Sequence, residues 1–126
     1  DWRGAWGPNP PFHTPVFVLT RHTRPPIEME GGPTFHFLDA PPEQALEAAR
    51  AAVPGQDVRI GGGATLIRAF LADRLIDHMH VVVAPILLGR GVRLWDGLEG
   101  LEQDYAIESV PSPSGVTHVT FTRAGA

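Results

Sequence analysis

The sequence predicts an α/β fold with a mixed, mostly parallel sheet that ends in an antiparallel hairpin. Strand-like and helix-like stretches alternate along residues 16–83, which is the order typical of α/β packing. The C-terminal part instead holds two alternating stretches around a loop of Pro, Ser and Gly, which indicates a hairpin. A chain of 126 residues is long enough for one domain, and we expect a single domain over residues 1–126.

The first part of the chain contains two expected strands and one expected helix. Residues 1–15 are rich in Pro, Gly and Trp, which favours an extended or looped segment. Residues 16–20 form a continuous β-forming run, typical of a strand buried on both faces of a parallel sheet. Residues 34–38 predict a second, short strand. Residues 41–53 predict a helix, because proline suits its first turn and Pro54-Gly55 ends it.

The chain is organised around residues 58–71, where a strand-like run leads through three glycines into a helical pattern. Apolar side chains in residues 66–75 recur at the spacing of one helix face. Glycines let an anion approach the main chain, and a helix start offers unpaired N–H groups and a positive dipole end. We therefore expect a phosphate or pyrophosphate at Gly61, Gly62 and Gly63. The alternative is that these glycines only make a tight strand-to-helix turn.

The end of the first expected strand is a second place where an anion would fit. The β-forming run ends at Thr20, and Arg21 and Arg24 follow it. Ligands of open α/β sheets bind beyond the carboxyl ends of strands, and guanidinium groups pair well with phosphate. These residues are candidates for holding a ribose 2′-phosphate. The alternative is a solvated basic turn.

The histidines of the next expected strand do not predict a metal site. Residues 79–85 predict this strand, which residues 86–89 extend beyond a proline. His78 and His80 are two positions apart and share one face. A metal needs at least one further ligand, and the chain has no cysteine, so we expect no metal.

The C-terminal hairpin contains an expected strand edge that could contact another chain. Residues 105–110 and 116–122 alternate polar and apolar side chains around their loop. No charge interrupts the end of the last strand before Arg123, and an unpaired strand edge favours association. We therefore expect this edge to favour association with another chain.

Composition narrows the range of partners. The net charge is −4 and no basic block is present, which argues against a nucleic-acid partner. No apolar run approaches the about 18 residues of a membrane span, and no signal peptide is visible, so we expect no membrane partner. The absence of cysteine suits a cytoplasmic protein. Because the chain has no lysine, an anionic ligand would meet arginines and main-chain amides.

With these elements placed, the chain resembles the dihydrofolate reductase-like superfamily. The most similar branch is named after the C-terminal reductase domain of the bacterial riboflavin-biosynthesis deaminase-reductase. The resemblance covers nearly the whole chain. It is carried by residues 15–20, by residues 58–66, by residues 75–77 with the histidine-bearing strand after them, and by residues 84–91.

The resemblance implies a three-layer αβα fold, a homodimer, and NADPH as hydride donor to a small heterocyclic substrate. An activity of the 5-amino-6-(5-phosphoribosylamino)uracil reductase type fits this branch. The glycine turn and helix start would face the cofactor pyrophosphate, the end of the first strand its adenosine side, and the residue before the glycines its nicotinamide. The implied cofactor-binding residues are Thr20, Arg21, Ile60, Gly61, Gly62, Gly63, Ala64, Thr65 and Leu66.

The chain also departs from its relatives. Riboflavin-pathway reductases carry a substrate-contacting glutamate at the position of Gly61, and dihydrofolate reductases an aromatic residue at that of Leu66. The family domain begins with a strand and a helix, bearing the usual acidic proton donor, that would precede Asp1, so we expect an N-terminally shortened domain. We name no catalytic acid, because Asp77 and Asp96 are more simply interpreted as turn residues. The alternative to a reductase is a non-catalytic nucleotide-binding or dimerisation module on the same fold.

Overall fold

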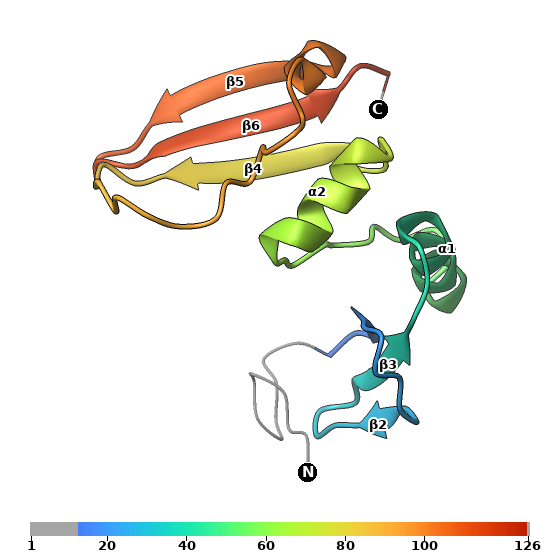
Figure 1. Ribbon diagram of the computed structural model, residues 1–126. Coiled ribbons are helices and arrows are strands. Elements are labelled where there is room, and N and C mark those ends of the chain that lie inside the picture. Colours follow the sequence, from blue (N-terminus) through green and yellow to red (C-terminus); the bar gives the residue numbers. More distant parts are fainter. Residues whose placement is uncertain (1–12, 126) are drawn as a thin grey trace. The chain divides into compact units, whose positions relative to one another are not determined.

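The computed structural model describes residues 13–125 of the chain (Figure 1). Contacts between residues divide the chain after Arg59 into two compact units, and we describe each unit by itself. Most of the segment expected to be extended or looped at the start of the chain lies outside the described residues. The expectation of a single domain over residues 1–126 stays a prediction.

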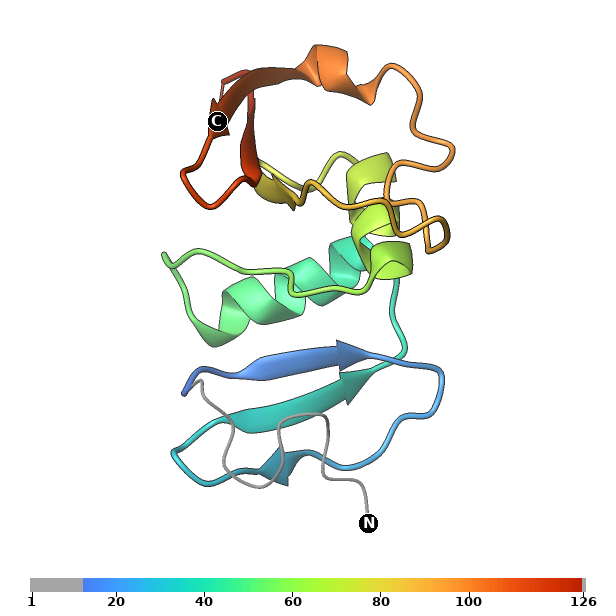
Figure 2. The ribbon, with the colours of Figure 1, turned by 90° about the vertical axis from the view of Figure 1, so that its left-hand side faces the viewer.

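The first unit contains a three-stranded sheet and one helix (Figure 2). Strand β1 (Val16–Leu19) pairs in parallel with β3 (Thr34–Leu38), and β2 (Ile27–Glu28) pairs with β3 in antiparallel. Helix α1 (Pro42–Ala52) follows and contacts β1. The two strands and the helix expected in this part of the sequence are confirmed, whereas the sequence does not predict β2.

The buried side chains in the described part of the first unit come from β3, the residue before it and α1. They are Phe35 on the strand, Pro33 just before it, and Ala45 and Leu46 on the helix. Strand β1 is only half-buried along its length, so the expectation that it is buried on both faces is wrong. The physical reason is its place in the sheet: β3 is its one neighbour among the strands of residues 13–59, which leaves its other edge unpaired.

The second unit contains a helix and an antiparallel sheet (Figure 1). Helix α2 (Ala64–Ala72) is followed by β4 (His78–Val83), and the short 3₁₀ helix η1 (Leu101–Asp104) leads into β5 (Tyr105–Pro111) and β6 (Thr117–Arg123). The strand order is β4-β6-β5, with both pairings antiparallel. The expected helix, the expected strand after it and the C-terminal hairpin are therefore confirmed.

The order of these strands corrects the expectation about the hairpin edge. Because β6 lies in the middle of its sheet, both of its edges are hydrogen-bonded, to β4 and to β5. In the described part of the chain, the outer edges of this sheet belong to β4 and β5. The last strand therefore offers no edge for pairing with a second chain, although the sequence before Arg123 predicts one.

The extent of parallel pairing is smaller than expected. The described residues form two three-stranded sheets, and β1 with β3 is the one parallel pair among them. The run at residues 58–60 has no strand partner and forms a connection, and residues 86–89 likewise leave the sheet after β4. Apolar, β-branched sequence favours a strand, but a strand forms only where a neighbour completes its hydrogen bonds.

The buried residues of the second unit are Phe70, Leu71 and Ile76, all in or just after α2. Phe70 and Leu71 belong to the apolar face that the sequence predicts for this helix. In the described part of the chain, no helix has both the length and the apolar character needed to cross a membrane.

Candidate functional site

The glycine turn leads directly into the start of α2. Gly63 is the N-cap residue, with φ −80° and ψ −165°, and its carbonyl oxygen accepts a hydrogen bond of 3.0 Å from the N–H of Ile67. Among residues 13–125 no side chain caps this helix end. Because the first N–H groups of a helix have no partner within it, those of Ala64, Thr65 and Leu66 make no hydrogen bond within α2. This is the local geometry that an anion requires.

The three glycines before the helix leave space around the main chain. A Cβ atom added at Gly61, Gly62 or Gly63 would meet no heavy atom within 4 Å. Gly62 has φ +123°, a conformation that L side chains rarely adopt, so glycine is required there by the backbone itself. The Gly62–Gly63 peptide bond is cis. The turn therefore presents bare main chain to solvent, as the sequence predicts.

A cation lies one helical turn beyond these amides. The Nη2 of Arg68 donates a hydrogen bond of 3.4 Å to the Oγ1 of Thr65, and its Nη1 lies 3.7 Å from the Oδ2 of Asp96. The Arg68 side chain is 25 % exposed, so it is held against the protein and still reaches solvent. Our sequence analysis missed this residue. Its spacing of three from Thr65, on the same helix face, is the signal that would have identified it.

The structure brings seven of the nine predicted cofactor residues together in this one turn. Ile60 precedes the glycines and is half-buried, as are Ala64 and Leu66, whereas Thr65 is exposed. The other two residues, Thr20 and Arg21, belong to the first unit. The seven residues of the turn include no ionisable side chain, so the polar groups of the turn are its main chain and the Thr65 hydroxyl.

The end of β1 has a different character. The N–H of Thr20 donates to the carbonyl of Leu38 over 2.8 Å, and the Thr20 hydroxyl accepts a hydrogen bond of 3.0 Å from the N–H of His22. Arg21 is exposed, and the guanidinium of Arg24 lies 5.7 Å from the centre of the Phe37 ring. The hydroxyl is thus engaged in a local turn, which is the arrangement expected of a solvated basic loop.

The two aspartates considered as acids have structural partners. Asp77 forms an ion pair with Arg123, whose guanidinium also donates to the carbonyl of Arg74. These contacts tie the end of α2 to β6. Asp96 faces Arg68. The interpretation of Asp77 and Asp96 as structural residues at turns is consistent with these contacts.

Tyr105 supports the same corner of the second unit. Its hydroxyl donates a hydrogen bond of 2.6 Å to the carbonyl of Ile76. Burial raises the pKa of Tyr105, an effect that nearby Arg123 partly offsets. A neutral phenol that donates to a buried carbonyl is a packing element, and we assign it no chemical role.

The histidines form a pair that the sequence does not predict. His80 on β4 and His118 on β6 lie diagonally across the two strands, with Nε2 and Nδ1 2.9 Å apart. His78 shares the face of His80, as expected, but no group of three or more metal-ligating side chains occurs in the described residues. Because His118 is distant in sequence, only the register of β4 and β6 brings it to His80.

Comparison with solved structures finds the same fold. A protein from Shewanella sp. PV-4, provisionally described as a riboflavin biosynthesis protein, is 30% identical and superposes with a TM-score of 0.64 over 90% of this chain and 62% of its own. A pyrimidine reductase-like protein from Corynebacterium diphtheriae is 19% identical, with a TM-score of 0.52 over 75% of this chain and 40% of its own. The chain thus spans less than two thirds of either structure. The likeness confirms the predicted α/β, dihydrofolate reductase-like fold.

Comparison with protein sequences establishes the family. No curated protein matches the chain. The model of the RibD C-terminal domain matches residues 2–112, which include the glycine turn, the start of α2 and the histidine-bearing strand. The chain therefore belongs to the RibD C-terminal domain family, as the resemblance in its sequence implies.

Proposed function

We propose that the chain is an NADPH-dependent reductase that transfers hydride to a small heterocyclic substrate, in a reaction of the 5-amino-6-(5-phosphoribosylamino)uracil reductase type. The observation that carries this proposal is the uncapped start of α2 behind Gly61, Gly62 and Gly63, in a chain of this family. A dinucleotide has a pyrophosphate that suits such a helix start.

The residues of the turn fit the cofactor in charge and shape. The amides of Ala64, Thr65 and Leu66 would hold the pyrophosphate, and the open space beside the glycines admits it. Arg68 adds a fixed positive charge one turn away. The assignment of Ile60, which is apolar and half-buried, to the nicotinamide rests on the resemblance. The assignment of Thr20 and Arg21 to the adenosine side rests on the resemblance.

NADPH supplies the hydride when it is bound, and the work of these residues is to bind and orient it. Main-chain amides are fixed by the helix, so they need no reorganisation when the phosphate arrives. The turn itself holds no proton donor, since residues 60–66 contain no acid or base.

Thermal unfolding with and without NADPH tests cofactor binding. A ligand of the native state stabilises it by about 2.7 kcal/mol at a concentration of 100 Kd, so the melting temperature should rise with NADPH concentration. NADH, which lacks the 2′-phosphate, should give a smaller rise. No rise with saturating NADPH would contradict the proposal.

Turnover separates the reductase from its alternative. Oxidation of NADPH is followed with a panel of pterins and pyrimidinones, including 5-amino-6-(5-phosphoribosylamino)uracil. Oxidation that depends on one of these compounds supports the reductase. Stabilisation by NADPH without oxidation across the panel would favour a non-catalytic nucleotide-binding module instead.

We further propose that the chain forms a homodimer and acts in the cytoplasm. Around the free edge of β4 and the segment after it, large apolar side chains are exposed: Val82, Val83, Ile86, Leu87 and Leu88, with exposed fractions of 49%, 53%, 64%, 101% and 75%. Large apolar side chains exposed close together along the chain favour association. We propose these residues, and not the edge of β6, as the contact between the two chains of the dimer.

Light scattering with Leu87→Lys tests the dimer. Leu87 is fully exposed, so a charge there should leave folding intact and shift the population to monomer. The matched control is Ala51→Lys at an exposed position of α1, which should remain dimeric. A wild-type chain that stays monomeric at high concentration would contradict the proposal.

A further inference from the structure

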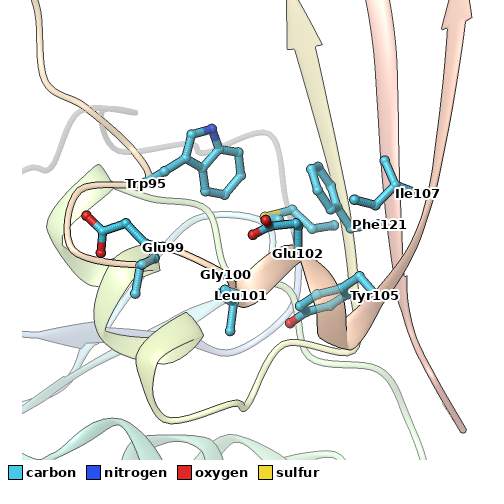
Figure 3. Close-up of a pocket in the computed structure, with 10 residues that line it drawn as sticks. Trp95, Glu99, Gly100, Leu101, Glu102, Tyr105, Ile107 and Phe121 are labelled. Atoms are coloured by element: carbon cyan, nitrogen blue, oxygen red, sulfur yellow. The ribbon is translucent and has the colours of Figure 1, made fainter.

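We propose that the second unit has a separate binding site for a flat aromatic cation, in the pocket between its sheet and the loop that precedes β5. The pocket has a volume of about 580 Å³ (Figure 3). That size falls within the range of small-molecule sites in proteins. All of its lining residues belong to the second unit.

One wall of the pocket is a row of apolar side chains across the sheet. Met79 on β4, Phe121 on β6 and Ile107 on β5 are cross-strand neighbours, so they share one face of the three strands. Their face is opposite to that of His80 and Glu108, since side chains alternate along each strand. The sheet therefore presents an apolar floor to a ligand.

Aromatic rings border this floor. The Trp95 and Phe121 rings are tilted by 53° with centroids 5.7 Å apart, and Tyr105 meets Phe121 edge to face at 6.1 Å. Trp95 comes from the loop and Tyr105 from the start of β5 (Figure 3). Because the Tyr105 hydroxyl donates to Ile76, that residue presents only its ring. Such surroundings favour a flat aromatic body.

The charge of the pocket is negative. Glu99 and Glu102 are the ionisable acids of its lining, and the lining holds no Arg, Lys or His. In the described part of the chain, neither glutamate takes part in a salt bridge with another residue. In Figure 3 the Glu102 carboxylate is directed toward the space beside Trp95 and Phe121. Carboxylates and aromatic faces both attract a cation and both disfavour an anion.

These properties distinguish the pocket from the glycine turn. The turn offers amides and Arg68 to an anion, whereas the pocket offers carboxylates and rings to a cation. The pocket is also not filled by the protein itself, because Trp95 and Ile107 remain 43% and 48% exposed. A ligand that covers them gains apolar burial that the folded chain leaves unused.

A matched pair of probes tests the proposal. 9-Aminoacridine is a flat cation at neutral pH, and acridine-9-carboxylate has the same ring system with a negative charge. Binding of each to the full chain is measured by fluorescence titration, with and without saturating NADPH. We expect 9-aminoacridine to bind about tenfold more tightly, with an affinity that falls as salt is added and that NADPH leaves unchanged.

Variants locate the binding. Glu102→Gln should weaken 9-aminoacridine several-fold, and Ile107→Trp, which fills the pocket from a half-exposed position, should abolish its binding. Glu108→Gln removes a carboxylate from the opposite face of the same strand and should change nothing. Circular dichroism and melting temperature establish that each variant is folded.

Three results would overturn the proposal: equal affinity for the two acridines, the same loss in Glu108→Gln as in Glu102→Gln, or binding that survives in a folded Ile107→Trp chain. Displacement of 9-aminoacridine by NADPH would also overturn it, because the two sites would then be one. If NADPH does not bind, the titrations without NADPH still test the pocket. The reductase proposal and the pocket proposal can therefore fail independently.

Discussion

The two places where the sequence predicts an anion, the start of α2 and the end of β1, are built differently. At α2 the binding groups are main-chain amides fixed by the helix, with Arg68 held beside them by Thr65 and Asp96. At β1 the Thr20 hydroxyl already accepts a hydrogen bond within its own turn, and Arg21 is an exposed side chain. The first place is preorganised, and the second depends on one side chain that must be ordered by its ligand.

This difference indicates where binding free energy originates. Amides fixed by a helix lose little entropy when a phosphate arrives, whereas an exposed arginine must give up several rotamers and compete with salt. We therefore expect the start of α2 to dominate affinity for NADPH and the end of β1 to adjust it. The variants below test that order.

The largest effect is expected from Gly62→Ala. The φ of +123° at Gly62 strains any side chain, so the turn should shift and affinity for NADPH should fall at least about tenfold. The free energy of unfolding should fall by about 1–2 kcal/mol. Isothermal titration and urea unfolding measure the two effects.

Gly55→Ala is the control for strain alone. Gly55 has φ +77° and open space around it, but it lies beyond the C-terminal end of α1. It should lose similar stability and keep its affinity for NADPH. Equal losses of affinity in the two variants would mean that general destabilisation, and not the shape of the glycine turn, controls binding.

A smaller effect is expected from Arg68→Ala. The guanidinium beside the amides of α2 should contribute a charge-assisted hydrogen bond, and its loss should weaken NADPH about fivefold. Arg50→Ala, on the exposed face of α1, is the matched control and should bind normally. An unchanged affinity in Arg68→Ala would remove this residue from the site.

Arg21→Ala should have a weaker effect still. An exposed ion pair is worth little, so we expect about a twofold loss of affinity for NADPH at low salt and none at high salt. NADH should bind the variant and the wild type equally, because it lacks the 2′-phosphate. A loss larger than that of Arg68→Ala would reverse the order proposed for the two places.

The smallest effect on binding is expected at Tyr105, which lies outside both places. Tyr105→Phe removes the hydrogen bond to Ile76 and should lower stability at neutral pH by about 1 kcal/mol without changing affinity for NADPH. Burial raises the pKa of Tyr105 in the folded chain above its value in the unfolded chain. The stabilisation that results is complete below the unfolded pKa and is lost as the pH rises through the folded pKa.

The wild type should therefore lose stability above about pH 10, and Tyr105→Phe should show a shallower loss. Chemical unfolding at a series of alkaline pH values measures the slope. The same slope in both chains would mean that another group titrates there.

The glycine turn and the start of α2 were predictable because their signals are local. The positive φ at Gly62 requires glycine, and α2 requires apolar residues at helical spacing. Both patterns can be recognised within a few neighbouring residues. The prediction of a strand at residues 58–60 is wrong. β-Branched residues favour the extended conformation, but they do not indicate whether a neighbouring strand is present to pair with.

Features that depend on strand order could not be predicted. The sequence before Arg123 indicates a free edge, but β6 lies between β4 and β5. The pairing of His80 with His118 and the apolar row under Trp95 depend on the same register. Arg68, in contrast, has a local signal, because it follows Thr65 by three positions on the same helix face.

The most direct test of the central claim follows the main-chain amides of the second unit by NMR while NADPH is added. If the start of α2 holds the cofactor pyrophosphate, the amide resonances of Ala64, Thr65 and Leu66 should shift most, and pyrophosphate alone should move the same three signals. Binding of NADPH that leaves these amide signals in place would contradict the account.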